Sequence, residues 1–422
     1  MSAVTFPGGR REIEAIGLVG FAHSVSHFFQ LMMPALFPWL LREFDLTFTQ
    51  LGVTTTVFFT VSGIGQFLAG FVVDRVGARR ALLGGIMLLG LAGVILGLAP
   101  NYATLILVAA VAGAGNSVFH PADFTLLNHN VSDRRLGHAF SVHGLSGNLG
   151  YAAAPVVMAG ITLATDWRIA AFAASGLALA ALLPLLIRRD ALTVEPHVRA
   201  AAQASATNES TFGFLGVGAV WLCFVFFLVI TAAAAGLQNF GPLALHHLYG
   251  MSVAAAASSL TAMLLGGAAG MALGGFLVAR QEAHERLIAA VLVAAAIFAT
   301  CLASGAPPAW SVTVLMAGLG FCTGMAGPSR DMLVRRAATA RFGAAAYGRV
   351  YGFVYSGLDV GFALSPVLVF GPLMDAGRYA GVLLGVAILQ SFAIAAALSV
   401  GRGISARDEP VPLGPSASKE PA

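Results

Sequence analysis

The sequence has little charge. Only 10% of its 422 residues are Asp, Glu, Lys or Arg, whereas an average globular protein has about 25%. Apolar residues make up 58%, against roughly 45–50% in globular proteins. So few charges cannot cover soluble domains of this size, which excludes a soluble enzyme, a DNA-binding protein and a disordered tail protein. The composition therefore predicts a polytopic integral membrane protein.

Cysteines and catalytic motifs are also scarce. The three cysteines, Cys223, Cys301 and Cys322, lie in apolar runs and form no CxxC pair, which excludes a disulfide framework and a thiolate metal site. The chain has no Walker loop, GxSxG elbow or HExxH motif, which argues against direct ATP coupling and against a membrane protease or lipase. We therefore expect no enzyme activity, no cofactor and no resident metal.

Long apolar runs are what the sequence does contain. A helix needs about 20 apolar residues to cross a bilayer, and these runs do not alternate in the way that a transmembrane β-barrel requires. We predict an all-α integral membrane fold with twelve transmembrane helices, at residues 15–41, 51–73, 81–99, 103–128, 137–163, 168–187, 214–245, 253–279, 286–304, 309–333, 347–371 and 378–400.

The basic residues orient these spans. Of the 23 Lys and Arg residues, only Arg42, Arg168 and Arg378 lie in odd-numbered connections, and Arg330 lies within the tenth span. The others lie in the even-numbered connections, the termini and the adjoining span ends. Because basic residues favour the cytoplasmic side, we predict an inner (plasma) membrane protein with both termini in the cytoplasm. The net charge of +4 then reflects topology and not a nucleic-acid partner.

The chain divides into two similar six-helix halves. The stretch from Gly70 to Arg75 recurs from Gly275 to Arg280, a shift of 205 residues. We predict an N-terminal half at 1–187, a cytoplasmic linker at 188–213, a C-terminal half at 214–402 and a disordered cytoplasmic tail at 403–422. Halves repeated in parallel imply a pseudo-twofold axis along the membrane normal, with the substrate site between them near mid-membrane.

A glycine- and arginine-rich loop joins the second and third spans. It contains the six residues Gly70, Asp74, Arg75, Gly77, Arg79 and Arg80, and it resembles the signature loop of the major facilitator superfamily. The resemblance covers residues 15–400 and implies a transporter whose halves rock about a central site. It also implies that Asp74 sits at the N-terminus of span 11 and that the loop is a conformational gate, latching the cytoplasmic side closed. The alternative is that the arginines only set the topology.

Three alanines depart from patterns of this superfamily. Ala279 replaces the acid in the second copy of the loop, so we expect a weak latch or none there. Ala109 stands where proton-coupled drug exporters usually carry an arginine, and Ala154 precedes Pro155 where the antiporter pattern has glycine. The departures at Ala109 and Ala154 argue against a generic multidrug exporter.

Histidines lie inside the predicted spans. His23 in span 1, His120 in span 4 and His143 in span 5 fall at similar depths, with His23 and His143 roughly 9–12 Å from the cytoplasmic ends of their spans. They can therefore meet Asp123 near one level of the membrane. Because imidazole titrates near physiological pH, we predict that these four residues couple transport to protons. The alternative is that each histidine bonds to a neighbouring helix and joins the helices together.

A second, shorter resemblance concerns the same spans. The chain is similar to the fosmidomycin-resistance branch of the superfamily in two places. These are Phe119-His120-Pro121, which follows Gly113-x-Gly115, and the histidine-rich first span. This resemblance implies export of a small polar or anionic compound in exchange for protons.

The second half carries different polar groups. Gln238 and Asn239 interrupt the apolar run of span 7, which predicts a bent helix with polar side chains at the cavity. Arg330 in span 10 either holds an anionic substrate or forms a structural ion pair. Asp359 lies near mid-membrane in span 11 with no base beside it in sequence, and we predict that it is a second proton-coupling group. Its alternatives are pairing with Arg330 or a hydrogen bond to the backbone.

The sequence thus predicts a secondary active transporter that works by alternating access and exports a small polar or anionic molecule or drug. We expect a monomer in the lipid bilayer, with the substrate and protons as its partners. Two rivals are a transition-metal or metabolite transporter of the same fold, since Met32 and Met33 accompany the histidines, and a membrane sensor that moves nothing. The predicted substrate-binding side chains are His27, Gln30, Asn116, Asn148, Tyr151, Gln238, Asn239, Arg330, Asp331, Tyr351 and Tyr355.

Overall fold

The computed structural model describes residues 9–192, 216, 218–278, 284–342 and 347–408. The described chain is helical apart from short turns, and it contains no strand. Most of the predicted linker at 188–213, the last part of the predicted tail, and the side chains of Asp74, Asp331, Tyr351 and Tyr355 lie outside the described residues.

The first six predicted spans form the helices of the N-terminal half. They are α1 Gly9–Met32, η1 Pro34–Leu36, α2 Phe37–Glu43, α3 Phe48–Val76, α4 Ala78–Gly97, α5 Tyr102–Asn116, α6 Phe119–Asn130, α7 Asp133–Ala164 and α8 Trp167–Ile187, followed by the short turn η2 Arg189–Leu192. Span 1 is interrupted at Pro34, because proline has no N–H for the helical ladder. Span 4 is interrupted between Asn116 and Phe119.

The remaining spans form the C-terminal half. They are α10 Gly218–Tyr249, α11 Val253–Val278, α12 His284–Ala303, α13 Ala309–Phe342, α14 Tyr347–Ser365, the π-helical turn η5 Pro366–Phe370, α15 Gly371–Asp375 and α16 Tyr379–Asp408. Span 11 is thus divided into three pieces. The helix α16 continues to Asp408, so the first residues of the tail predicted at 403–422 are helical.

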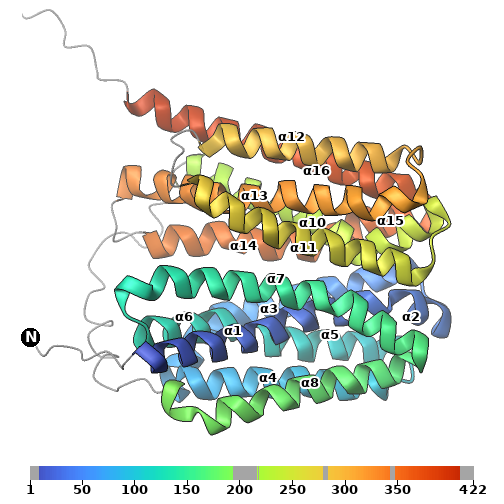
Figure 1. The fold of residues 1–422 in the computed structure, drawn as a ribbon, viewed down its shortest axis with the longest axis horizontal. Coiled ribbons are helices and arrows are strands. Elements are labelled where there is room, and N and C mark those ends of the chain that lie inside the picture. The colour runs from blue at the N-terminus through green and yellow to red at the C-terminus, as the bar shows by residue number, and fades with distance from the viewer. Residues whose placement is uncertain (1–8, 193–215, 217, 279–283, 343–346, 409–422) are drawn as a thin grey trace, which may run out of the picture.

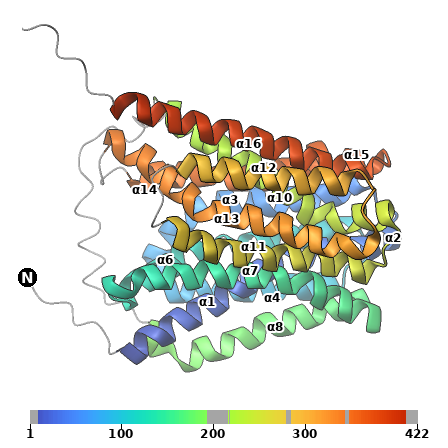
Figure 2. The same cartoon turned by 45° about the horizontal axis from the view of Figure 1, so that its top comes forward.

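The helices form one elongated bundle of twelve spans. Eleven helical segments of the described chain are long and apolar enough to cross a membrane, and α3, which is 29 residues long and packs among them, supplies the twelfth. The helices lie side by side, with α1–α8 in one half and α10–α16 in the other (Figure 1). Figure 2 shows that α2 and α15 lie at one end and the start of α1 at the other. We call the first of these the α2–α15 end.

Two glycines let α1 and α7 pack closely. A Cβ atom at Gly150 of α7 would overlap the carbonyl oxygen of Ser24 on α1. A Cβ atom at Gly147, one turn earlier, would lie 2.7 Å from the His27 ring and 3.0 Å from His23 Nε2. The absence of side chains at these positions therefore allows the histidines of α1 to reach the surface of α7.

The variant Gly150→Ala is expected to push α1 and α7 apart. The added methyl group meets a backbone oxygen, so we expect a loss of stability of about 1–3 kcal/mol, the usual cost of overpacking. The measurement is the thermal unfolding midpoint in detergent. The control is Gly160→Ala on the same helix, where a Cβ atom has nothing within 4 Å. Equal midpoints for the two variants would contradict the close packing.

Candidate functional site

Asp123 of α6 is the centre of a buried polar cluster in the N-terminal half. Its side chain is 0% exposed. Its Oδ2 atom accepts a hydrogen bond from His143 Nε2 of α7 at 3.0 Å. The same oxygen lies 3.2 Å from His23 Nδ1 of α1, in a contact that is not aligned as a hydrogen bond. One carboxylate oxygen is thus shared by imidazoles from two helices.

Four imidazole rings gather around this carboxylate. The rings of His23 and His143 are stacked, with centroids 3.6 Å apart. The centroid of His27 lies 4.3 Å from that of His23, and the centroid of His120 lies 5.5 Å from it. Like charges at these distances repel one another strongly in an apolar interior. A charge on one of these rings therefore disfavours a charge on its neighbours.

Gln66 of α3 orients His120. Its Oε1 atom lies 2.8 Å from His120 Nδ1. An amide oxygen only accepts hydrogen bonds, so Nδ1 is the donor in this contact. The other ring nitrogen, Nε2, is then free to accept a proton.

An amide network adjoins the imidazoles. Asn116 Oδ1 accepts hydrogen bonds from Ser26 at 2.5 Å and from Gln30 Nε2 at 3.1 Å, and Asn116 Nδ2 donates to Ser62 at 2.7 Å. The hydroxyl of Tyr151 donates to Gln30 Oε1, and the Tyr151 ring lies 4.3 Å from that of His27. Side chains from α1, α3, α5 and α7 thus form one connected polar surface.

Three atoms of the cluster have no hydrogen-bond partner within the described part of the chain. They are His23 Nδ1, His27 Nδ1 and Asp123 Oδ1. Because buried polar atoms in proteins are normally paired, a water molecule, a proton or a ligand is expected to complete these sites. Two sets of three side chains each place their ligand atoms within 4.8 Å of one another: His23, Asp123 and His143, and His23, His27 and His120. Such a set also suits a transition-metal ion.

The cluster contains eight of the sequence-predicted site residues: His23, His27, Gln30, Asn116, His120, Asp123, His143 and Tyr151. Five others lie outside the hydrogen-bonded cluster: Asn148, Gln238, Asn239, Arg330 and Asp359. Asn148 Nδ2 donates to the carbonyl of Gly144 on its own helix at 3.1 Å and contacts Met271 Sδ at 3.7 Å. The Arg330 guanidinium lies 4.7 Å from the centre of the Phe227 ring. Asp359 of α14 faces α3 of the other half. A Cβ atom at Gly63 of α3 would lie 3.3 Å from the Cβ atom of Asp359.

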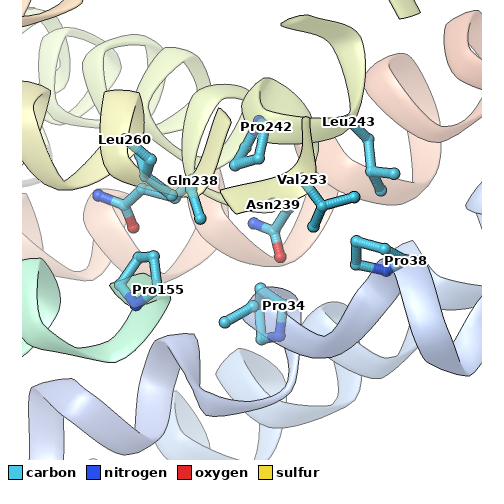
Figure 3. A pocket seen from close by; sticks show the side chains of 11 residues that line it. Pro34, Pro38, Pro155, Gln238, Asn239, Pro242, Leu243, Val253 and Leu260 are labelled. Carbon is cyan, nitrogen blue, oxygen red and sulfur yellow. The ribbon is translucent and has the colours of Figure 1, made fainter. Parts of the chain in front are cut away.

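Gln238 and Asn239 lie between the halves, toward the α2–α15 end. Asn239 Oδ1 accepts a hydrogen bond from Thr55 of α3 at 2.6 Å, which ties α10 to the N-terminal half. Figure 3 shows both amides beside Pro34, Pro38 and Pro155. These residues line a small cavity of about 20 Å³. In this conformation Asn239 therefore contributes to a contact between the halves.

Aromatic residues fill the same region. Phe59 of α3 stacks on Phe362 of α14 with centroids 4.5 Å apart, and Phe240 of α10 packs against Phe37 and Phe48 at 5.9 and 6.4 Å. These contacts join the two halves, so the α2–α15 end of the bundle is closed.

The predicted gate loop lies at the opposite end. It contains the end of α3, with Gly70 and Asp74, and the start of α4. Gly77 has a φ of 94°, which favours glycine, and it allows α4 to begin directly after α3. Arg75 and Arg80 are exposed and Arg79 is half-buried. The contact predicted for the Asp74 side chain lies outside the described residues.

Three residues of the site were not predicted from the sequence: Ser26, Ser62 and Gln66. Ser62 and Gln66 lie four residues apart on α3, and Thr55 lies seven residues before Ser62. Thr55, Ser62 and Gln66 therefore share one face of the helix. This polar stripe in an otherwise apolar span was the signal in the sequence that identifies the inward face of α3.

Comparisons with known proteins agree with this architecture. The family model described as Major Facilitator Superfamily matches residues 19–366. The uncharacterized MFS-type transporter YfnC of Bacillus subtilis is 32% identical over 34% of this chain and 34% of its own length. The fosmidomycin resistance protein of Escherichia coli is 31% identical over 37% of this chain and 39% of its own length. These matches thus span little more than a third of either relative.

The fold itself is found in solved structures. A bacterial homologue of the human lysosomal transporter Spinster, in an inward-facing and occupied conformation, aligns with a TM-score of 0.71 at 14% identity. The alignment covers 95% of this chain and 98% of that one. At this identity the likeness concerns the fold alone.

Proposed function

The chain belongs to the Major Facilitator Superfamily, and on that premise we propose that it exports a small polar or anionic molecule in exchange for protons. Secondary transport of a small molecule across a membrane follows from the family. The observation that carries the proton part is Asp123, a fully buried carboxyl group inside a span, which contacts both His23 and His143. Ionisable groups in such places are costly to keep and are usually functional.

Charge balance explains how this group can work. With one proton shared among Asp123, His23 and His143, the three side chains have no net charge. Without that proton they carry one uncompensated negative charge, which an apolar interior disfavours. The proton is therefore expected to leave only when the cluster is open to water or when another group takes its place. Proton release is in this way tied to conformation.

The amide network is the proposed substrate surface. Gln30, Asn116 and Tyr151 offer donors and acceptors to a polar ligand, and His27 joins this surface to the proton cluster. A ligand that bonds to these groups must rearrange the hydrogen bonds that they make with one another. Substrate binding is thereby coupled to the positions of the imidazoles.

Asp359 supports a role for the C-terminal half. Its Cβ atom lies 3.3 Å from the position that a Cβ atom would take at Gly63 of α3, next to Ser62 of the amide network, although the two residues belong to opposite halves. A rocking motion that separates the halves changes this distance. We therefore keep Asp359 as a second proton-coupling group, and Arg330 as a candidate for an anionic substrate.

Orientation and direction complete the proposal. The distribution of arginines supports termini in the cytoplasm, and in that orientation the closed α2–α15 end faces outward. Export is supported by the similarity to the fosmidomycin resistance protein. We propose an inner-membrane location and a monomer as the working unit.

Uptake into proteoliposomes tests the proposal. The purified full chain is reconstituted, a pH gradient is imposed, and accumulation of a labelled phosphonate such as fosmidomycin is followed. We expect accumulation that stops when a protonophore collapses the gradient. Accumulation that does not depend on the pH gradient would indicate a uniporter, and the histidines would then have a structural role only. Flux of Zn²⁺ or Co²⁺ instead of the phosphonate would favour the metal-transporter hypothesis.

A further inference from the structure

An acidic side chain of one half caps a helix of the other half at the α2–α15 end. Asp375 is the last residue of α15. Its Oδ1 atom accepts a hydrogen bond from the backbone N–H of Phe48 at 2.6 Å, and its Oδ2 atom accepts one from the N–H of Thr49 at 3.0 Å. The hydroxyl of Thr49 donates to Oδ2 as well. Phe48 and Thr49 are the first two residues of α3.

The first turn of α3 is complete only with this carboxylate. The N-cap residue Thr47 and Gln50 form a capping box, in which Thr47 Oγ1 accepts from the N–H of Gln50 and Gln50 Oε1 accepts from the N–H of Thr47. The capping box does not bond the backbone N–H groups of Phe48 and Thr49. The first N–H groups of a helix also have no partner within the helix itself. Asp375 binds both, and its negative charge lies at the positive end of the α3 dipole.

The backbone around Asp375 is shaped for this contact. A Cβ atom at Gly52 of α3 would lie 2.8 Å from the carbonyl oxygen of Pro366, and one at Gly371 would lie 2.8 Å from the Thr49 Cα. The π-helical turn η5 precedes α15 and lies against α3. The end of span 11 thus rests directly on the start of span 2, and Asp375 is held in place by this packing.

We propose that Asp375 is a latch that holds the α2–α15 end closed. Opening this end requires the halves to separate, so the bonds from Phe48 and Thr49 must break. The resemblance of the loop at 70–80 to its family implies a counterpart at the opposite end, where an acid at the end of span 2 sits on the start of span 11. The Asp375 contact has the same design with the halves exchanged. Each latch would then stabilise one of the two conformations.

Thiol labelling of full-length protein in nanodiscs tests the latch, and it does not depend on substrate, protons or transport. Cys223, Cys301 and Cys322 are replaced by serine, and Thr55→Cys is introduced as a reporter, since Thr55 is buried between the halves. The rate of reaction with a charged thiol reagent measures how often this end opens. We expect Asp375→Asn to raise the labelling rate about tenfold, because the charge-assisted hydrogen bonds that hold this end closed are weakened.

A matched control separates the latch from helix capping in general. Asp166 also caps a helix at this end, but it bonds to the N–H of Arg168 at the start of α8 within its own half. Asp166→Asn should leave the labelling rate unchanged, and Asp375→Glu should restore part of the slow rate. If the Thr55 reporter impairs folding, Phe59→Cys, buried against Phe362, replaces it. Unchanged labelling in Asp375→Asn, or an equal rise in Asp166→Asn, would overturn the proposal.

Discussion

Asp123→Asn is expected to abolish uphill transport and to preserve substrate exchange. Asparagine has nearly the same shape and can still accept the hydrogen bond from His143 through its oxygen, so the packing should survive. It cannot take up a proton at any working pH. Because each transport cycle would need that proton, we expect gradient-driven uptake to fall by about 100-fold or more, the size of effect seen when a proton-transfer group is lost.

Two assays in proteoliposomes distinguish coupling from general damage. Uptake of labelled substrate driven by a pH gradient measures coupling, and exchange of internal for external substrate measures binding and rocking without net proton movement. Asp166→Asn, whose carboxylate caps α8 outside the cluster, is the control for expression and folding. Full gradient-driven uptake by Asp123→Asn would move the coupling site elsewhere. Asp359→Asn is the first alternative to examine in that case.

Asn116→Leu is expected to destabilise the N-terminal half and to weaken substrate binding. Asn116 makes hydrogen bonds to Ser26, Gln30 and Ser62, which come from α1 and α3. An interhelical hydrogen bond in a membrane protein contributes about 0.6 kcal/mol on average, so the loss of three amounts to roughly 2 kcal/mol. If the same surface binds the substrate, we also expect KM to rise about tenfold, the equivalent of about 1.4 kcal/mol.

The matched control for this variant is Asn148→Leu. Asn148 is half-buried on α7, and its amide bonds to a carbonyl of its own helix and contacts Met271. Its replacement should lower the thermal unfolding midpoint much less. A wild-type midpoint and KM for Asn116→Leu would show that the amide network is neither a structural joint nor a substrate surface.

Much of the fold could be predicted from composition and periodicity. In the membrane every backbone N–H and C=O must be paired within the span, so long apolar runs become helices almost regardless of context. The interruptions were harder to place. Pro34 and Pro366 end regular helix where the sequence shows proline, but the same residue type at Pro155 and Pro242 lies within continuous helices. Neighbouring helices decide between these outcomes.

The site was partly predictable for a different reason. The depths of His23, Asp123 and His143 along their helices depend only on the rise per residue, and the structure brings the three side chains together. Their role in proton coupling stays a prediction. Gln66 was missed because its depth along α3 does not single it out, and only the stripe that it forms with Thr55 and Ser62 marks the inward face of that helix.

Asp375 illustrates what sequence alone conceals. An acid at the end of a span, next to a turn, is normally a solvated surface charge, and Asp375 is indeed exposed. Its contact with α3 joins residues 326 and 327 positions apart in the chain. Only the packing of one half on the other creates it.

Proton release on substrate binding is the most direct test of the central claim, that Asp123 and its histidines hold the coupling proton. If a proton and the substrate compete, binding of either must weaken binding of the other by the same factor. Substrate added to purified protein in weakly buffered detergent, with a pH dye, should release roughly one proton per molecule bound, and Asp123→Asn should release none. Unchanged release in Asp123→Asn would contradict the account and place the coupling proton outside the cluster.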